Sequence, residues 1–346
     1  MADNSNAPTV LITGGSSGIG RCTAMLFASR GWAVGLVARG LPGLETVRDE
    51  IAATGATAAI AVADVADAKA LAGAADRIES ELGPIEVWVN NAGISFYGAF
   101  PDITEAEFQR VTDVTYMGAV NGTRIALQRM TAKGEGSIVT VGAAIAYRGV
   151  PLQTAYSGAK FALRGFTEAV QSELRHAGSR IHVAMVHPPA VNTPFFSHAG
   201  SRMRGVPRPV APVYPPGTIA RAIYQAATTN QREITVGAPT IGLAWMNRLI
   251  PGAVDRMAGW FGFRSQQTEA PEVVERRDEA VFHPASRPSP VHGPFAAEAV
   301  AEGIDHPSRY RFWVVALLAG VGVLALANRR RDARPPCPRQ QAEMEA

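Results

Sequence analysis

The chain contains little cysteine, little lysine and little charge. Its two cysteines, Cys22 and Cys337, stand far apart in the 346 residues, with no Cys or His around them at metal-ligand spacing. This excludes a disulfide-stapled mini-protein, indicates a reducing compartment and gives no metal site. Charged residues are only 18% of the chain, and the net charge of +3 comes from arginines concentrated late. This local excess is weak support for nucleic-acid binding, and no nucleic-acid partner is expected.

The first residues also lack the features of a signal peptide. Residues 1–6 are polar and acidic, without a basic region or a long apolar stretch, and are predicted to be disordered. We therefore expect the N-terminal domain to stay in the cytoplasm. Hydrophobic residues make up 47% of the chain, which is enough for a full core and excludes wholesale disorder.

Residues 7–237 alternate short apolar runs with helical patterns, which predicts an α/β fold with a doubly wound parallel sheet, the Rossmann fold. Few charges interrupt the strands, as expected when helices cover both faces of the sheet. The expected strands are 9–12, 33–37, 57–62, 87–89, 137–141, 182–186 and 233–236, and the clearest helical patterns are 19–29, 68–82, 105–130, 155–176 and 218–228.

The sequence changes character after residue 237. Residues 238–263 are apolar with helical spacing, broken by Pro251-Gly252, and predict a helical extension that either packs on the domain or faces a membrane surface. Residues 264–308 are rich in Pro, Glu, Arg, Ser and His without a period and are interpreted as a linker.

A hydrophobic C-terminal helix is predicted next. Residues 312–327 are sixteen uncharged apolar residues between arginines, within a membrane helix expected at 309–331 and followed by a tail at 332–346. As a helix they would be roughly 24 Å long, against roughly 30 Å for a hydrocarbon core, so the span is marginal. We expect membrane contact through residues 312–327, with the topology left open and the catalytic domain in the cytoplasm.

A glycine-rich motif, TGGSSGIG at residues 13–20, directly follows the first strand and opens the first helix. Glycines let the backbone turn tightly and approach a pyrophosphate, whose charge is favoured by free N–H groups and the dipole at a helix N-terminus. The position predicts a dinucleotide site that includes Gly14, Ser16, Ser17, Gly18, Ile19 and Gly20.

With three further motifs in the same order, the sequence resembles the short-chain dehydrogenase/reductase family over about residues 7–237. These motifs are Asn90-Asn91-Ala92-Gly93 after the fourth strand, Tyr156-Ser157-Gly158-Ala159-Lys160 opening a helix, and Pro188 with Thr193 after the sixth strand. The resemblance implies an oxidoreductase whose cofactor also contacts Asn91, Ala92, Gly93, Pro188 and Thr193.

Tyr156 and Lys160 are four residues apart on the predicted helix and therefore share a face, so the ammonium can favour the phenolate. The resemblance implies that Tyr156 exchanges a proton with the substrate oxygen, while Lys160 lowers the tyrosine pKa and binds the nicotinamide ribose. Lysine otherwise occurs only at positions 69 and 133, in a chain that uses arginine elsewhere.

The cofactor is expected to be NADP(H). At the end of the second strand, Arg39 stands where an acidic residue would select NAD and a basic residue would accommodate the 2′-phosphate. After the third strand, Asp64 matches the family position that contacts the adenine, although on its own it could equally cap a helix.

Two positions depart from the family pattern. Ala143 stands thirteen residues before Tyr156, where the family usually has a serine that hydrogen-bonds the substrate oxygen; losing such a donor can cost roughly 10²–10³ in rate. Thr140 faces the other side of its strand, so Gln153, Thr154 or Tyr147 remain as alternative donors. Thr115 replaces a family Asn that holds a water, and its hydroxyl could bind the same water.

Three interpretations follow. The first is an NADP-dependent oxidoreductase that interconverts an alcohol and a carbonyl. The second is a catalytically weak or inactive NADP(H)-binding sensor or scaffold at the membrane, and the third, the least favoured, is a membrane-attached interaction protein. Residues 194–216, where the family carries a substrate lid, include Phe195, Phe196, Met203, Val210 and Tyr214, which suggest an apolar substrate. The sequence leaves the oligomeric state open, including a homo-oligomer.

Overall fold

The computed structural model describes residues 7–268, 279–285 and 287–300. The predicted membrane helix at 309–331 and the tail at 332–346 lie outside the described residues. Among the helices that the structure does describe, none is long and apolar enough to cross a bilayer.

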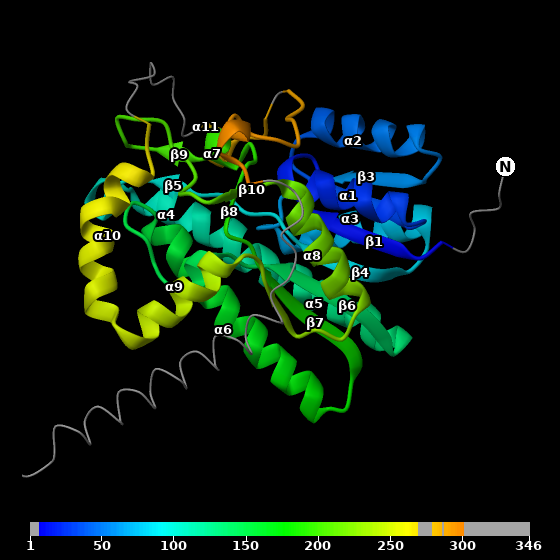
Figure 1. Cartoon of the computed structure of the whole chain (residues 1–346). Helices are drawn as coiled ribbons and strands as arrows, with labels where there is room; N and C mark the ends of the chain where they lie inside the picture. The colour runs from blue at the N-terminus through cyan, green and yellow to red at the C-terminus, as the bar shows by residue number, and fades with distance from the viewer. Residues whose placement is uncertain (1–6, 269–278, 286, 301–346) are drawn as a thin grey trace, which may run out of the picture. The chain divides into compact units, whose positions relative to one another are not determined.

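A seven-stranded parallel sheet forms the centre of the domain, in the order β11-β7-β6-β4-β1-β2-β3 (Figure 1). Reversal of strand order on either side of β1 and β4 is the doubly wound arrangement that the sequence predicts, so the fold class is confirmed. The strands are β1 (Thr9–Thr13), β2 (Ala33–Ala38), β3 (Ala58–Val62), β4 (Ile85–Asn90), β6 (Glu135–Val141), β7 (Arg180–His187) and β11 (Glu233–Thr235).

Helices cover both faces of this sheet. One apolar core lies between the sheet and α1 (Gly18–Ser29), α2 (Leu41–Ala53) and α8 (Pro216–Thr228). The other lies beneath α3 (Ala68–Leu82), α5 (Gly118–Lys133) and α6 (Thr154–His176). Both faces of the strands are therefore buried, which explains why the strands read as continuous apolar runs.

The helical pattern expected over 105–130 is divided in three. Helix α4 (Glu105–Thr112) begins at a capping box between Thr104 and Glu107, and α5 continues after a π-helical turn, η2 (Asp113–Met117). Such turns insert one residue into a helix and often occur at functional sites. This one carries Thr115.

Short elements connect the main ones at the carboxyl edge of the sheet. They are β5 (Phe96–Tyr97), η1 (Phe100–Asp102), η3 (Ala144–Ala146), β8 (Ala190–Val191), α7 (Phe195–His198), β9 (Gly200–Ser201) and β10 (Val213–Tyr214).

Two further helices follow the sheet, α9 (Ala238–Leu249) and α10 (Pro251–Ser265), and meet at Ile250. Proline at the first position of α10 suits a helix start, because its missing N–H would have no partner there. Val254 and Ile241 are buried, whereas many large apolar side chains of the pair are exposed. The pair therefore packs on the domain through few residues.

The described part of 264–308 differs from the linker that the composition predicts. It includes α11 (Glu279–Phe282) and η4 (Ala296–Glu298), and it hydrogen-bonds to the domain. For example, Phe295 N–H donates to Asn192 Oδ1 at 3.0 Å. Several of its hydrogen bonds use backbone groups, for which the composition gives no pattern.

Candidate active site

A cavity of about 510 Å³ lies at the carboxyl edge of the central sheet. Ligands of open α/β sheets bind at this edge, where the strand order reverses. The lining brings together nearly all of the predicted site residues: Gly14, Ser16, Ser17, Gly18, Ile19, Arg39, Asp64, Asn91, Ala92, Gly93, Tyr156, Lys160, Pro188 and Thr193.

Gly20 is the predicted site residue that does not line the cavity. A Cβ atom there would lie 2.2 Å from the carbonyl oxygen of Gly14 and 2.6 Å from Asn91 Nδ2. Its role is therefore steric, since glycine allows the turn and the first helix to approach each other closely.

Hydrogen bonds from Asn91 hold the glycine-rich turn in place. Its side-chain amide donates to the carbonyl oxygens of Thr13 at 3.0 Å and Gly14 at 3.2 Å, and its backbone N–H donates to Thr13 Oγ1 at 3.0 Å. Gly14 and Gly18 have φ of +66° and +51°, which L side chains rarely adopt. The turn thus has a fixed shape, with the N-terminus of α1 directed at the cavity.

Tyr156 and Lys160 share one face of α6, with the lysine Nζ 5.5 Å from the centre of the tyrosine ring. The ammonium donates to the carbonyl oxygen of Val141 at 2.7 Å. Burial lowers the pKa of Lys160 to about 7 and raises the pKa of Tyr156. In this arrangement burial outweighs the effect expected from the sequence, in which the lysine ammonium lowers the tyrosine pKa.

Ala143 lines the cavity, so the family serine is missing at the surface that faces it. Of the three alternative donors, Gln153 is the one that lines the cavity within the described chain. Tyr147 points away, with its hydroxyl bonded to Glu233 and 3.4 Å from Thr235 Oγ1, and Thr154 lines a different, shallow depression beside α10.

Gln153 is oriented by two neighbours. Its Nε2 donates to Gln266 Oε1 at 2.6 Å, and its Oε1 accepts from the Ser95 hydroxyl at 3.4 Å. The amide of Gln266 is held in turn by the carbonyl oxygens of Pro151 and Gly262. Since a glutamine amide has two N–H groups, one N–H of Gln153 has no protein acceptor among these contacts.

Thr115 makes two hydrogen bonds that the sequence did not predict. Its hydroxyl donates to the carbonyl oxygen of Ile94 at 2.9 Å and accepts from the Ile94 N–H at 3.1 Å. The side chain therefore fastens the loop after β4 to the π-helical turn. One acceptor lone pair remains for a water, and no donor does.

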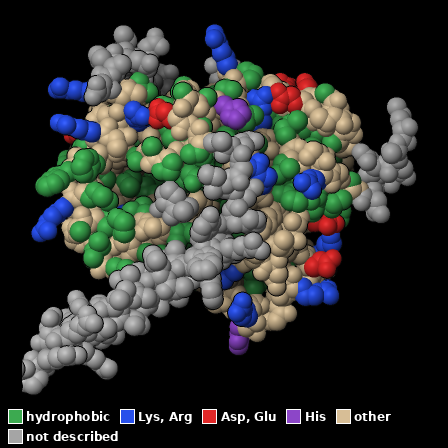
Figure 2. Space-filling model, in the orientation of Figure 1, with side chains coloured by type: hydrophobic (Ala, Val, Ile, Leu, Met, Phe, Trp, Pro, Cys, Tyr) green, Lys and Arg blue, Asp and Glu red, His purple; other side chains and the backbone are tan. Residues whose placement is uncertain are grey.

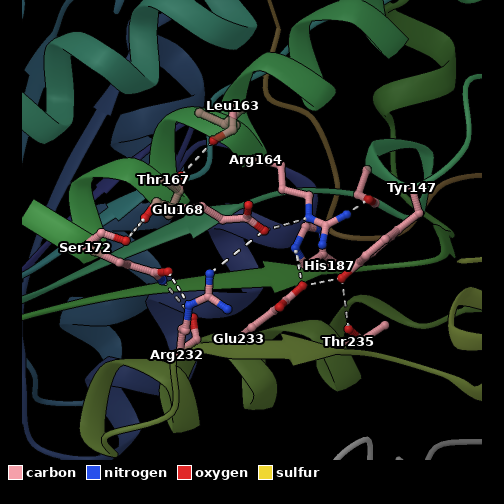
Figure 3. Close-up of polar contacts among 12 residues, drawn as sticks. Tyr147, Leu163, Arg164, Thr167, Glu168, Ser172, His187, Arg232, Glu233 and Thr235 are labelled. Carbon is pink, nitrogen blue, oxygen red and sulfur yellow. Dashed lines mark hydrogen bonds and ion pairs between the residues drawn. The ribbon is translucent and has the colours of Figure 1, made fainter.

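A buried polar cluster behind residue 143 was not anticipated from the sequence (Figure 3). His187, at the end of β7, is fully buried, with Nδ1 3.3 Å from the Ala143 carbonyl oxygen and Nε2 3.2 Å from Glu233 Oε1. Glu233 also accepts from the Tyr147 hydroxyl. The contact with His187, followed by that with Tyr147, lowers the pKa of Glu233 to about 2 despite its burial.

This cluster holds the backbone around Ala143 in place. The guanidinium of Arg164 covers the Tyr147 ring at 4.2 Å, and the Tyr147 ring packs 4.8 Å from that of His187. The available sequence signal was a histidine within an apolar strand, directly before Pro188, and such a residue is more often a core residue than a functional one.

The opposite end of the cavity is rich in arginine. Asp64 pairs with Arg110, and its other oxygen accepts from the Ala66 N–H at 3.0 Å. It does not cap the next helix, because the N-cap of α3 is Asp67. Arg39 lies near both, and its pKa is lowered by burial and then by the charge of Arg110. This end of the cavity therefore carries the Arg39 guanidinium beside the Asp64–Arg110 ion pair.

A segment that we call the strap, residues 281–285 and 287–290, lies over the arginine end. Arg39 Nη1 donates to the carbonyl oxygens of Val281 at 3.0 Å and Phe282 at 3.2 Å, and Arg21 Nη1 donates to that of Ser289 at 2.7 Å. The backbone N–H of Gly18 donates to the Pro290 carbonyl oxygen at 3.3 Å. Two of these donors, Arg39 and the Gly18 N–H, belong to residues that the sequence assigns to a dinucleotide site.

The reaction end is apolar by comparison. Phe195 lies 5.5 Å from Tyr156, ring centre to ring centre, and Phe196, Val210 and Leu243 also line the cavity. Of the other residues expected in the lid, Met203 and Tyr214 are outside the lining.

Comparison with known proteins agrees with this geometry. Residues 8–203 match the family model described as short chain dehydrogenase. The chain is 34% identical over 278 residues to an uncharacterized oxidoreductase, YxnA, of Bacillus subtilis. The matched region covers 80% of this chain and 78% of that protein. It is 33% identical to a bovine 3-ketodihydrosphingosine reductase over 193 residues, 54% of this chain and 58% of that protein.

Solved structures share the fold. A short-chain dehydrogenase/reductase from Mycobacterium marinum superposes with a TM-score of 0.59 at 26% identity, covering 67% of this chain and 95% of that one. An alcohol dehydrogenase of Thermococcus sibiricus in complex with 5-hydroxy-NADP gives 0.58 at 23% identity, covering 67% and 96%. With its parallel sheet, glycine-rich turn and Tyr156–Lys160 pair, the chain belongs to the short-chain dehydrogenase/reductase family and is a Rossmann-fold oxidoreductase.

Proposed function

We propose that the protein is an NADP(H)-dependent oxidoreductase that interconverts an alcohol and a carbonyl on an apolar substrate. The observation that carries the proposal is that one cavity holds Tyr156 and Lys160 at its apolar end and the glycine-rich turn and Arg39 at its arginine end. The chemistry of the donors suits a dinucleotide, because backbone N–H groups, glycines without room for a Cβ and a guanidinium match a pyrophosphate and a 2′-phosphate.

When bound, the cofactor supplies or accepts the hydride. Tyr156 then exchanges the proton with the substrate oxygen, and Lys160 stands beside the ring to stabilise the phenolate that forms. With a pKa near 7, Lys160 can itself pass a proton around neutral pH.

Gln153 takes the place of the missing serine in this proposal. Its side chain lines the cavity, its orientation is fixed by Ser95 and Gln266, and one amide N–H is available to the substrate oxygen. This hydrogen bond would orient the carbonyl toward Tyr156, which is the task of the hydroxyl that Ala143 lacks.

The apolar substrate follows from the aromatic and aliphatic lining at the reaction end. The bovine relative is named for a ketone on a long-chain lipid, which supports a lipophilic ketone or alcohol here. Attachment to a membrane through residues 312–327, with the domain on the cytoplasmic side, remains part of the proposal. Fractionation of cells that express the full chain and a version ending at Gly303 tests it.

The test of function has two steps. Titration with NADPH and NADH, followed by fluorescence, should give tighter binding of NADPH. A panel of short and long-chain ketones should then show NADPH oxidation, fastest with apolar substrates. Binding without turnover of any ketone or alcohol would favour the second candidate, an NADP(H) sensor or scaffold, which the absence of a hydroxyl at Ala143 supports.

A further inference from the structure

Large apolar side chains gather on the outer face of α9 and α10. Trp260 is 76% exposed, Phe261 65%, Leu249 58% and Ile250 53%, and Met246, Met257 and Phe263 are also exposed. These seven residues, which we call the α9–α10 face, make up half of the exposed large hydrophobic residues in the described chain. Figure 2 shows hydrophobic side chains gathered over these helices. Clusters of this kind mark an interaction surface.

The face belongs to an anchored pair of helices. Asn247 Nδ2 donates to the Tyr147 carbonyl oxygen at 3.1 Å, and Arg148 pairs with Asp255 at 2.6 Å. On α10, Val254 is 2% exposed, and Ala258 and Gly262, one and two turns later, are partly buried, which marks the side that meets the domain. Met257 and Trp260 are exposed on another side of the helix, and Phe261 is exposed near its end. The helix pair is thus attached to the domain with the α9–α10 face outward.

Positive charge accompanies the α9–α10 face. Arg248, Arg256 and Arg264 are exposed, and no ion pair is found for them in the described parts of the chain. Asp255, the acidic residue of the pair, is already paired with Arg148. Aromatic residues beside arginines are the composition of helices that lie in the headgroup region of an anionic bilayer.

We propose that the α9–α10 face docks on a lipid bilayer that carries anionic headgroups. A two-fold contact with a second copy would bring the arginines of both copies to one interface, where like charges repel. The apolar run at 312–327 is followed by Arg329, Arg330 and Arg331. Its positive charge would repel the arginines of this face, so it is not the expected partner. An anionic bilayer satisfies both the apolar face and the arginines.

Docking in this way would bring the cavity toward the lipid. Thr240 and Leu243 of α9, together with Gln266 after α10, form part of the cavity wall. The docking inference itself does not depend on the proposed activity, because it follows from the exposed face and its charge.

The test measures where the face lies when the full chain meets a vesicle. In a Cys22→Ser, Cys337→Ser background, a nitroxide label is placed by Trp260→Cys, by Phe261→Cys as a second site, and by Val62→Cys, 54% exposed on β3, as the matched control. Vesicles contain phosphatidylcholine alone or with phosphatidylglycerol. Circular dichroism checks that each variant folds as the parent does.

On anionic vesicles, accessibility to oxygen relative to a water-soluble nickel chelate should rise at least fivefold at position 260 and stay unchanged at position 62. Arg248→Glu with Arg256→Glu should abolish that rise. A label at 260 that stays in water would overturn the inference, whether the protein binds vesicles through another segment or does not bind. A second result would also overturn it: a label at position 260 that is already shielded from water without vesicles, in a protein with twice the mass of one chain. That result would assign the face to a contact with a second copy.

Discussion

The two ends of the cavity achieve their chemistry by opposite means. At the arginine end, Arg39 donates to strap carbonyl oxygens, and Arg110 and Arg21 pair with carboxylates. At the reaction end, Lys160 is buried and Tyr156 half-buried, and desolvation shifts both pKa values toward the neutral forms. One end therefore recognises charge, and the other is prepared to move a proton.

The largest effect should come from the reaction end. Tyr156→Phe removes the hydroxyl and almost none of the surface, so turnover should fall about 10³-fold while the NADPH dissociation constant changes less than twofold. Tyr224→Phe is the matched control and should keep full turnover, because Tyr224 lies on α8, outside the cavity lining, with its ring packed against Phe27 of α1. Unchanged turnover in Tyr156→Phe would show that another group carries the proton.

Gln153→Leu should lower kcat by about 10²-fold, because it deletes the donor proposed to orient the substrate oxygen. Steady-state kinetics and NADPH binding, measured together, separate this from a loss of cofactor. Gln171→Leu provides the control, because this partly exposed glutamine lies within α6, the helix that Gln153 precedes, and hydrogen-bonds only with Arg232 and Val183 in the described chain. Equal rates for Gln153→Leu and the parent would refute the assignment.

Removing the charge of Glu233, which lies behind the reaction end, should mainly lower the free energy of unfolding. The pKa of Glu233 falls from 4.5 to about 2 in the fold, so its stabilising effect is present above pH 4.5 and is lost as the pH falls toward 2. We expect Glu233→Gln to lose about 2 to 3 kcal/mol of unfolding free energy at pH 7 and much less at pH 3.

Urea unfolding at both pH values measures this difference. Glu168→Gln removes a carboxylate from a more exposed cluster on α6 and should cost at most about 1 kcal/mol. A loss for Glu233→Gln that is the same at pH 3 and pH 7 would mean that the charge is not what stabilises the cluster.

At the arginine end, Arg39→Ala should weaken NADPH binding about 10- to 30-fold and NADH binding less than threefold, because a charged hydrogen bond to the 2′-phosphate is lost. Isothermal titration with both cofactors gives the ratio. Arg48→Ala, on the neighbouring helix α2 and paired with Asp49, controls for a general loss of positive charge. Parallel losses for the two cofactors would remove Arg39 from the choice between them.

The smallest effect is expected from restoring the family hydroxyl. Ala143→Ser should raise kcat about fivefold, because the new hydroxyl adds to the donor that Gln153 is proposed to supply. In a Gln153→Leu background the gain should be larger, and a double-mutant cycle measures the difference. Additive effects would show that the two donors serve different atoms.

The sequence predicted the sheet well because strand burial and helical spacing leave a direct pattern in residue order. All seven strands of the sheet lie where apolar runs were expected, from Thr9–Thr13 to Glu233–Thr235. The cavity residues could be predicted equally well, because the glycines of the turn and the Tyr156–Lys160 pair occur at spacings that their chemistry requires. By contrast, the bonds of Gln153 with Gln266 and of His187 with Glu233 join residues distant in sequence, and spacing carries no signal for them.

The strap has a consequence for how its sequence can vary. Arg39, Arg110, Arg21 and the Gly18 N–H all bond to its backbone carbonyl oxygens, those of Val281, Phe282, Ser289 and Pro290. Every amino acid carries that acceptor, so most single substitutions in the strap leave these bonds available. Length and path are constrained instead, and an insertion or deletion of one residue would shift each carbonyl away from its donor. The strap is therefore expected to tolerate substitutions far better than changes in length.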